Sequence, residues 1–363
     1  MKRLWLVVLL PVSIAVLLAA RLSPQATEQS YSLGFYPVWA SIFALLTGWL
    51  PFSLVEWLLV GFMLWALVYT IRTVAVVVRC KERRGTALRE WAATATACLS
   101  LGMFLFALNC GPNYHRYTFT RYSGLEVRES SREELAALCA ELTAQANGLA
   151  GQVQRDASGE MKLSKNVYDT AKDARTAYAA LAEVYPVLAV GAKTTPKPVM
   201  LSLLLSYARI TGIFSAYTYE ANVNVHTNDY TIPATMCHEL THVAGFMRED
   251  EANFIAYLAS RGSENPDFAY SGTLQAFTYV SNALYSEDRE LWKSVVEQLD
   301  HHVWLDLRRS GEYWRSFETK FGDFSEKVND TYLKVNSQQD GIKSYGRMID
   351  LLLAEYRQRI SVN

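Results

Sequence analysis

A five-residue pattern in the second half of the chain, His238-Glu239-Leu240-Thr241-His242, has the residue types and the spacing of a zinc site. On a helix, residues four apart lie one turn apart on the same face. The imidazoles of His238 and His242 can therefore both reach one Zn²⁺ ion at about 2.0–2.1 Å. Glu239 is placed to reach a metal-bound water and to act as general base, while zinc lowers the pKa of that water towards about 7. The pattern predicts one Zn²⁺ ion and assigns the catalytic role to Glu239.

A third ligand is expected from the acidic stretch that follows the pattern. Gly245 stands where the first helix can end and the chain can turn, and Glu249, Asp250 and Glu251 come directly after it. Glu249 shares a helix face with small residues and with Asn253, so that helix can pack closely on the first one. Glu251 shares its face with large apolar residues, which is typical of a core. We predict Glu249 as the ligand, with Glu251 as the alternative, and Asn253 as a side chain that orients a ligand.

The same five residues would also occur on an ordinary charged helix. Their neighbours Met236, Cys237, Leu240 and Val243 are apolar or weakly polar, so the helix is expected to be buried, where histidines need partners. Two histidines, one carboxylate and one open position are typical of catalytic zinc, which favours hydrolysis of peptide bonds in a peptide or protein substrate. A non-catalytic zinc- or peptide-binding sensor or anchor is the alternative, although such a site does not need Glu239. Hydrolysis of a non-peptide bond, such as a cell-wall amide, is a weaker third possibility.

Further polar residues are candidates for contact with a substrate. Residues 217–232 alternate apolar and polar side chains, which predicts a strand directly before the motif helix. If this strand lies at a sheet edge beside the cleft, an extended substrate can pair with it near Asn222 and Asn224; a plain sheet strand is equally compatible with the pattern. The hydroxyls of Tyr270 and Tyr345 are candidates for stabilising an oxyanion, although a packed tyrosine is the more ordinary reading of each.

The first 111 residues contain the long apolar runs of the chain. Runs at about 4–20, 53–78 and 91–109 predict three membrane spans, of which the first could instead be a cleaved signal peptide. The run at 35–52 is rich in aromatic residues and interrupted by Pro and Gly, and we interpret it as an interfacial or re-entrant segment.

Charge asymmetry predicts how these spans are oriented. The loop between the second and third spans is basic, as are Lys2 and Arg3, so both should lie in the cytoplasm. The third span then carries the chain out, which makes residues 112–363 an extracytoplasmic domain on a bacterial cytoplasmic membrane. Contact with membrane lipid follows, whereas a net charge of −1 gives no reason to expect nucleic acid as a partner.

Residues 112–363 are predicted to be mainly α-helical with a small antiparallel β-sheet, an α+β fold. Helical spacing of apolar residues dominates, beginning with the segment 131–153, which starts with Ser131 before a pair of glutamates. Among the five cysteines, Cys110 and Cys139 are the pair that an oxidising compartment would allow to form a disulfide, although no spacing rule supports it.

Several stretches resemble known families. The residues Glu-Asp-Glu-Ala-Asn after the motif look like the third-ligand helix of gluzincin peptidases such as the membrane CAAX-type proteases, except that Asn253 replaces an acid and the gap from His242 is short. More of the chain resembles the bacterial membrane family called domain of unknown function 3810, in the order NYHRYTF, GIFSAYTYEANVN, CHELTHVAGFMREDEANFIAYLA, YSGTLQA and GIKSYGRMIDLLL. The resemblance implies a membrane-anchored, zinc-binding, zincin-like metallopeptidase domain. Ala216 and Tyr219 stand where that family usually has Pro and Gly.

Overall fold

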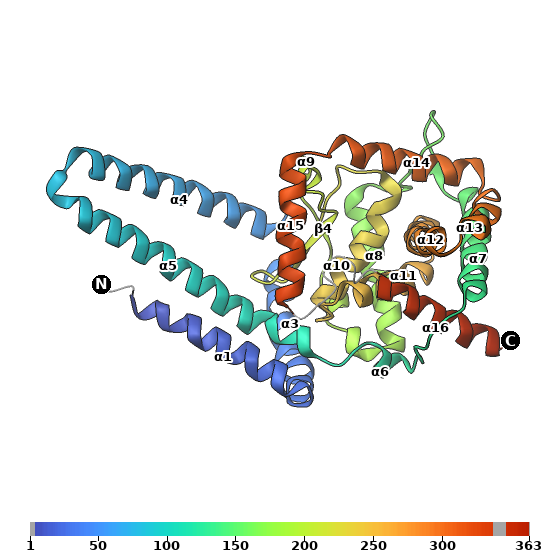
Figure 1. The fold of residues 1–363 in the computed structure, drawn as a ribbon, viewed down its shortest axis with the longest axis horizontal. Coiled ribbons are helices and arrows are strands. Elements are labelled where there is room, and N and C mark those ends of the chain that lie inside the picture. Colours follow the sequence, from blue (N-terminus) through green and yellow to red (C-terminus); the bar gives the residue numbers. More distant parts are fainter. Residues whose placement is uncertain (1–3, 337–345, 363) are drawn as a thin grey trace.

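Three long apolar helices project from one side of the molecule (Figure 1). The computed structural model describes residues 4–336 and 346–362. The projecting helices are α1 (Leu9–Leu22, preceded by the 3-10 turn η1, Leu4–Val8), α4 (Leu54–Arg79) and α5 (Arg84–Asn109, preceded by η3, Lys81–Arg83). Each of the three segments is long and apolar enough to cross a membrane, as the sequence predicts. Their orientation across that membrane stays a prediction.

The segment between α1 and α4 packs on the large domain. It consists of α2 (Pro24–Ala26), a π-helical stretch η2 (Thr27–Phe35) and α3 (Tyr36–Thr47). At 12 residues, α3 is shorter than the roughly 20 residues that a helical span requires. Tyr36 is fully buried, and its hydroxyl donates hydrogen bonds to the backbone carbonyls of His242 (3.3 Å) and Val243 (3.0 Å). Residues of this segment therefore form part of the core that surrounds the motif helix.

The domain is mainly α-helical, as predicted. Ser131 caps α7 through a reciprocal pair of hydrogen bonds with Glu134, which confirms the predicted helix start. The helical elements after α5 are η4 (Gly111–His115), α6 (Thr120–Ser123), α7 (Arg132–Ala150), α8 (Val167–Val184), η5 (Pro186–Leu188), η6 (Gly191–Lys193), α9 (Ser202–Tyr207), η7 (Asp229–Thr231), α10 (Ile232–Val243), α11 (Glu249–Arg261), α12 (Pro266–Glu287), α13 (Arg289–Val296), α14 (His301–Ser316), α15 (Lys320–Val335) and α16 (Gly346–Val362). The motif helix α10 lies inside this assembly, packed on α8, α11 and α12.

The sheet beside α10 is mixed, so the prediction of a purely antiparallel sheet was wrong for it. Its order is β3 (Lys197–Pro198), β5 (Glu220–Val223), β4 (Gly212–Ser215), with β3 parallel to β5 and β4 antiparallel to it. The predicted strand is thus the central one, shorter than expected and buried on both faces. A separate antiparallel hairpin joins β1 (Gln154–Arg155) and β2 (Met161–Lys162). The parallel pair was missed because a two-residue strand has no visible period.

Tyr219, at the turn from β4 into β5, has a left-handed backbone with φ of +56°. This conformation costs a non-glycine residue roughly 1–2 kcal/mol. The tyrosine side chain compensates, because it is fully buried and its hydroxyl donates a 2.6 Å hydrogen bond to the carbonyl of Asn109 at the end of α5. The turn thereby attaches the sheet to the third apolar helix.

All five cysteines lie in the described part of the chain, and none of them forms a disulfide. Cys110 and Cys139 are both buried free thiols, so the disulfide that the compartment would allow between them is absent.

A buried ion pair joins the segment before α3 to the domain. The Glu28 carboxylate accepts hydrogen bonds from the Arg116 guanidinium (2.9 Å), the Tyr117 backbone N–H (2.7 Å) and the Tyr122 hydroxyl. The side chains of Glu28 and Arg116 are 2% and 1% exposed. Arg116 also lies over the ring of Phe246, 4.0 Å from its centroid.

We expect Glu28→Ala to lower the free energy of unfolding by about 3–5 kcal/mol, because it leaves the Arg116 charge buried without a counter-charge. Unfolding of the full chain by a denaturing detergent in mixed micelles measures the change. Glu297→Ala is the matched control, since that side chain is 66% exposed, and little change is expected there. Equal stability of the two variants would contradict the importance of the buried pair.

Candidate metal centre

The turn after α10 sets the position of the candidate site. Pro233 lies in the first turn of α10, and the helix gives way at Ala244 to Gly245, whose φ is +87°. A Cβ at Gly245 would lie 2.8 Å from the Asn113 amide nitrogen, so both the backbone conformation and the space require glycine. The prediction that Gly245 ends the helix is confirmed. Four residues later, Glu249 opens α11, and α10 and α11 pack on each other.

Three ligand atoms converge between these two helices. The Glu249 carboxylate lies 3.3 Å from His238 Nε2 through Oε2 and 3.6 Å from His242 Nε2 through Oε1. The two Nε2 atoms are 3.0 Å apart. Ligand atoms of all three residues lie within 4.8 Å of one another. The structure thus brings together His238, His242 and Glu249, the three residues that the sequence selects.

Each histidine is oriented through its other ring nitrogen. His242 Nδ1 donates a 2.8 Å hydrogen bond to the backbone carbonyl of Phe246, and His238 Nδ1 donates a 2.9 Å bond to Asn253 Oδ1. Asn253 Oδ1 also accepts from Gln275 Nε2 at 3.0 Å, which fixes its amide. Hydrogen bonding at Nδ1 leaves the Nε2 lone pair of each ring for the shared space. Asn253 therefore contacts His238 as predicted for a side chain that orients a ligand.

These residues fit a zinc ion chemically. Two Nε2 lone pairs that face each other beside a carboxylate repel one another unless a cation or a proton lies between them. Without a metal the space is suited to a proton: although burial would lower the pKa of His242, its hydrogen bond to Glu249 raises it to about 9. Burial alone would raise the pKa of Glu249, but the two histidines hold it below its usual range. Two imidazole nitrogens and one carboxylate oxygen form a donor set of catalytic zinc sites.

Glu239 is buried next to this cluster with part of its hydrogen-bonding capacity unused. Its side chain is 3% exposed, and Oε2 has no hydrogen-bond partner among the described residues. Burial raises its pKa to about 7. Gly212, the first residue of β4, lies against the carboxylate so closely that a Cβ there would be 2.4 Å from Oε1. A carboxyl group with such a pKa can both take and return a proton near neutral pH.

The alternative ligand, Glu251, has a different place. Its Oε1 accepts a 2.7 Å hydrogen bond from the Phe119 backbone N–H, and the Arg248 guanidinium lies 3.4 Å from both carboxylate oxygens. The residue is 3% exposed and is not part of the three-residue cluster. Glu251 thus holds the segment before α6 against the start of α11.

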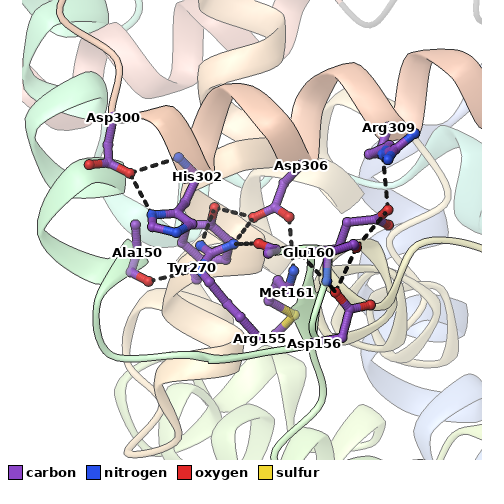
Figure 2. A network of polar contacts seen from close by, with 12 residues as sticks. Ala150, Arg155, Asp156, Glu160, Met161, Tyr270, Asp300, His302, Asp306 and Arg309 are labelled. Atoms are coloured by element: carbon purple, nitrogen blue, oxygen red, sulfur yellow. Dashed lines mark hydrogen bonds and ion pairs between the residues drawn. The ribbon is translucent and has the colours of Figure 1, made fainter.

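The proposed substrate contacts are not brought to the cluster. Asn222 Nδ2 donates to the carbonyls of Ile213 and Glu220, and Asn224 Nδ2 donates to the Ser206 hydroxyl and the carbonyl of Ile210. Both amides are buried in the central strand and the segment after it, because β5 is not an edge strand. Figure 2 shows the hydroxyl of Tyr270 turned to Asp306, to which it donates a 2.6 Å hydrogen bond, beside Arg155. Tyr345 lies outside the described residues.

Sequence reasoning missed residues that line the site from distant segments. Burial raises the pKa of Tyr279 of α12, and the nearby Glu249 carboxylate raises it further; the pKa of Tyr114 of η4 is raised mainly by burial and then by Tyr332. The Tyr114 hydroxyl is 2.6 Å from that of Tyr332 in α15. Gly212, in the edge strand β4, lies against the Glu239 carboxylate. No spacing rule connects these positions to the motif, because the fold alone brings them near it.

Gly212→Ala should displace either β4 or the Glu239 carboxylate, since the added methyl overlaps that side chain. Overpacking of this kind costs typically about 1–3 kcal/mol of stability. Detergent-induced unfolding of the full chain measures this loss. Gly148→Ala in α7 is the control. A Cβ at position 148 meets nothing within 4 Å, and replacing a glycine inside a helix by alanine should not lower stability. A Gly212→Ala protein as stable as Gly148→Ala would show that the contact with Glu239 is loose.

Comparison with known proteins identifies a family and nothing closer. No curated protein and no solved structure matches the chain. The family profile described as "Protein of unknown function (DUF3810)" matches residues 31–353, which include α3, two of the apolar helices and the whole His238–His242–Glu249 cluster. A match over this share of the 363 residues shows that the chain belongs to the DUF3810 family.

Proposed function

We propose that the chain is a membrane-anchored zinc metallopeptidase of the gluzincin type. One observation carries the proposal: two imidazole Nε2 atoms and the Glu249 carboxylate converge on one space, with both Nδ1 atoms already hydrogen-bonded to protein oxygens. Such an arrangement serves a metal better than it serves packing, because it brings two lone pairs together. We also propose that the domain lies on the extracytoplasmic side of the membrane, as the basic loop at 79–89 leads us to expect.

The roles of the residues follow from their positions. His238, His242 and Glu249 would hold the ion. Bound zinc would polarise a peptide carbonyl and lower the pKa of a water molecule. Glu239 would take the proton from the attacking water and deliver it to the leaving amide nitrogen. Its burial supports this role, because a carboxyl group held near a pKa of 7 exchanges protons readily in both directions.

The proposal places an extended peptide substrate along β4. β4 is at an edge of the three-stranded sheet, and its first residue, Gly212, is in contact with Glu239. A substrate that paired with β4 as an added strand would run past the general base. β4 thus takes the place that the sequence assigned to the strand with Asn222 and Asn224.

Metal analysis of the purified full chain tests the ligand set. The wild-type protein should hold about one zinc ion per chain, and His238→Ala, His242→Ala and Glu249→Ala should each lower the affinity strongly, since each removes one of three protein ligands. Glu251→Gln is the matched control, because its carboxylate contacts Phe119 and Arg248 instead, and it should retain zinc. Retention of zinc by Glu249→Ala, or its loss in Glu251→Gln alone, would overturn the assignment.

Glu239→Gln should abolish cleavage of a fluorescence-quenched peptide library while leaving the zinc content unchanged. The glutamine keeps the shape of the side chain but cannot accept the proton, and loss of general base catalysis costs about 10²–10⁴-fold in rate. Zinc content and cleavage are measured on the same preparation. Undiminished cleavage by Glu239→Gln would show that another residue, or another protein in the sample, does the chemistry.

A protein that binds zinc normally but cleaves none of these peptides would point to the non-catalytic sensor or anchor instead. The buried, partly unsatisfied carboxyl of Glu239 favours the peptidase over that alternative.

A further inference from the structure

Helix α15 carries an apolar stripe on its exposed side. The stripe residues follow one another at spacings of three and four, so they share one face of the helix. They are Phe321, Phe324, Val328, Tyr332 and Val335, with exposures from 42% to 77%. Lys320, Lys327 and Lys334 recur every seven residues and follow one edge of this stripe. Large exposed side chains in such an order require an apolar partner.

A second group of exposed apolar side chains lies on and around the short helix α9. Met200, Leu201, Leu203, Leu204 and Tyr207 are between 42% and 68% exposed. All three leucines are more than two-fifths exposed, even though they lie in an apolar run that a folded core would ordinarily bury. We refer to these residues and the α15 stripe together as the α9–α15 surface.

Helix α9 is fixed at the level where α4 begins. Glu56, in the first turn of α4, accepts hydrogen bonds from the backbone N–H groups of Met200 (3.0 Å) and Leu201 (2.7 Å). The same end of α4 is held by Glu220, whose carboxylate accepts 2.9 Å bonds from the N–H groups of Leu54 and Val55. Since α4 is apolar from this point on, the exposed leucines of α9 lie where that apolar helix would enter a bilayer.

Helix α15 is held near the ends of both apolar helices. Arg209, two residues beyond α9, forms ion pairs with Asp323 (3.2 Å) and Glu326 (3.0 Å) in the first half of α15. In the second half of α15, the ring of Tyr332 packs edge-on against that of Phe106 in the last turn of α5, with centroids 6.1 Å apart. Figure 1 shows α15 crosswise at the side of the domain from which α4 and α5 project.

We propose that the α9–α15 surface lies in the headgroup and upper acyl region of the bilayer that α4 and α5 cross. An amphipathic helix with lysines beside its apolar face is suited to the membrane plane, where the apolar face enters the acyl boundary and Lys320 and Lys327 reach anionic headgroups. Lys334 instead pairs with Asp330 of the same helix at 2.6 Å. Continuity with the exposed apolar surfaces of α4 and α5 selects lipid as the occupant. The domain thus contacts the membrane through α9 and α15 in addition to its apolar membrane helices.

The metal cluster lies close to this surface. The Tyr332 hydroxyl of the stripe lies 2.6 Å from that of Tyr114, and the adjacent Asn113 lies against Gly245, in the turn between the two helices that carry the cluster. If the proposed peptidase activity holds, its substrates are polypeptides at the membrane surface. That last step rests on the proposed function, whereas lipid contact by α15 does not.

Spin labelling of the full chain in vesicles of phosphatidylethanolamine and phosphatidylglycerol tests the lipid contact. Cys80→Ser and Cys98→Ala remove the two accessible thiols, and Cys110, Cys139 and Cys237 are buried. Phe324→Cys and Val328→Cys are then labelled singly; both positions are exposed, so folding is not at risk. Labels there should collide more often with oxygen, which dissolves in lipid, than with a water-soluble nickel chelate.

Lys293→Cys is the control, because its side chain is 65% exposed on α13, at the end of the domain remote from α4 and α5 in Figure 1. Its label should favour the nickel chelate. The inference is overturned if the α15 labels match the Lys293 label, which would place the stripe in water. It is equally overturned if they are shielded from both reagents, which would mean that protein covers the stripe. None of these outcomes depends on zinc or on cleavage.

Discussion

The turn at the end of α10 is the constraint on which the candidate site depends. The last carbonyls of a helix lack partners within it and must find them elsewhere. Here Tyr36 donates to the carbonyls of His242 and Val243, and Arg116 donates to that of Ala244 at 3.3 Å. The helix can therefore stop abruptly at Gly245, and the chain returns in time for Glu249 to face the histidines. The residues that satisfy this turn come from segments next to the apolar helices, so the anchor and the site form one unit.

The local part of the site could be predicted from sequence because helices impose their own spacing. The four-residue interval predicted His238 and His242 as ligands, and the position next to His238 predicted Glu239 as the base. The helix face shared with Asn253 favoured Glu249 over Glu251 as the third ligand. All of these positions lie within about fifteen residues of one another, where geometry is fixed by one helix or one turn. The three apolar helices were predictable for the same reason, since length and hydropathy are properties of a single segment.

What could not be predicted depends on long-range contacts. The parallel pairing of Lys197 and Pro198 with β5 joins strands too short to show alternation, and it puts at the centre of the sheet a strand that the sequence left open as edge or interior. That change buries Asn222 and Asn224 and leaves Gly212 next to Glu239. Tyr270 was a candidate for stabilising an oxyanion, but Asp306 and Arg155 bind its hydroxyl, so it is a packed tyrosine, the more ordinary of the two readings. The local sequence does not indicate which residues more than a hundred positions away will be hydrogen-bond partners.

The contact between Tyr36 and the end of α10 has a consequence for how the protein is made. Tyr36 and His242 are 206 positions apart, so the first is synthesised long before the second exists. The segment 27–43 can first pack only against the end of α5, through Leu108 and Asn109, and against Arg116, which lies 88 positions after Glu28. The end of the histidine-bearing helix therefore acquires the Tyr36 hydrogen bonds only when a segment made early in synthesis packs against one made 206 positions later.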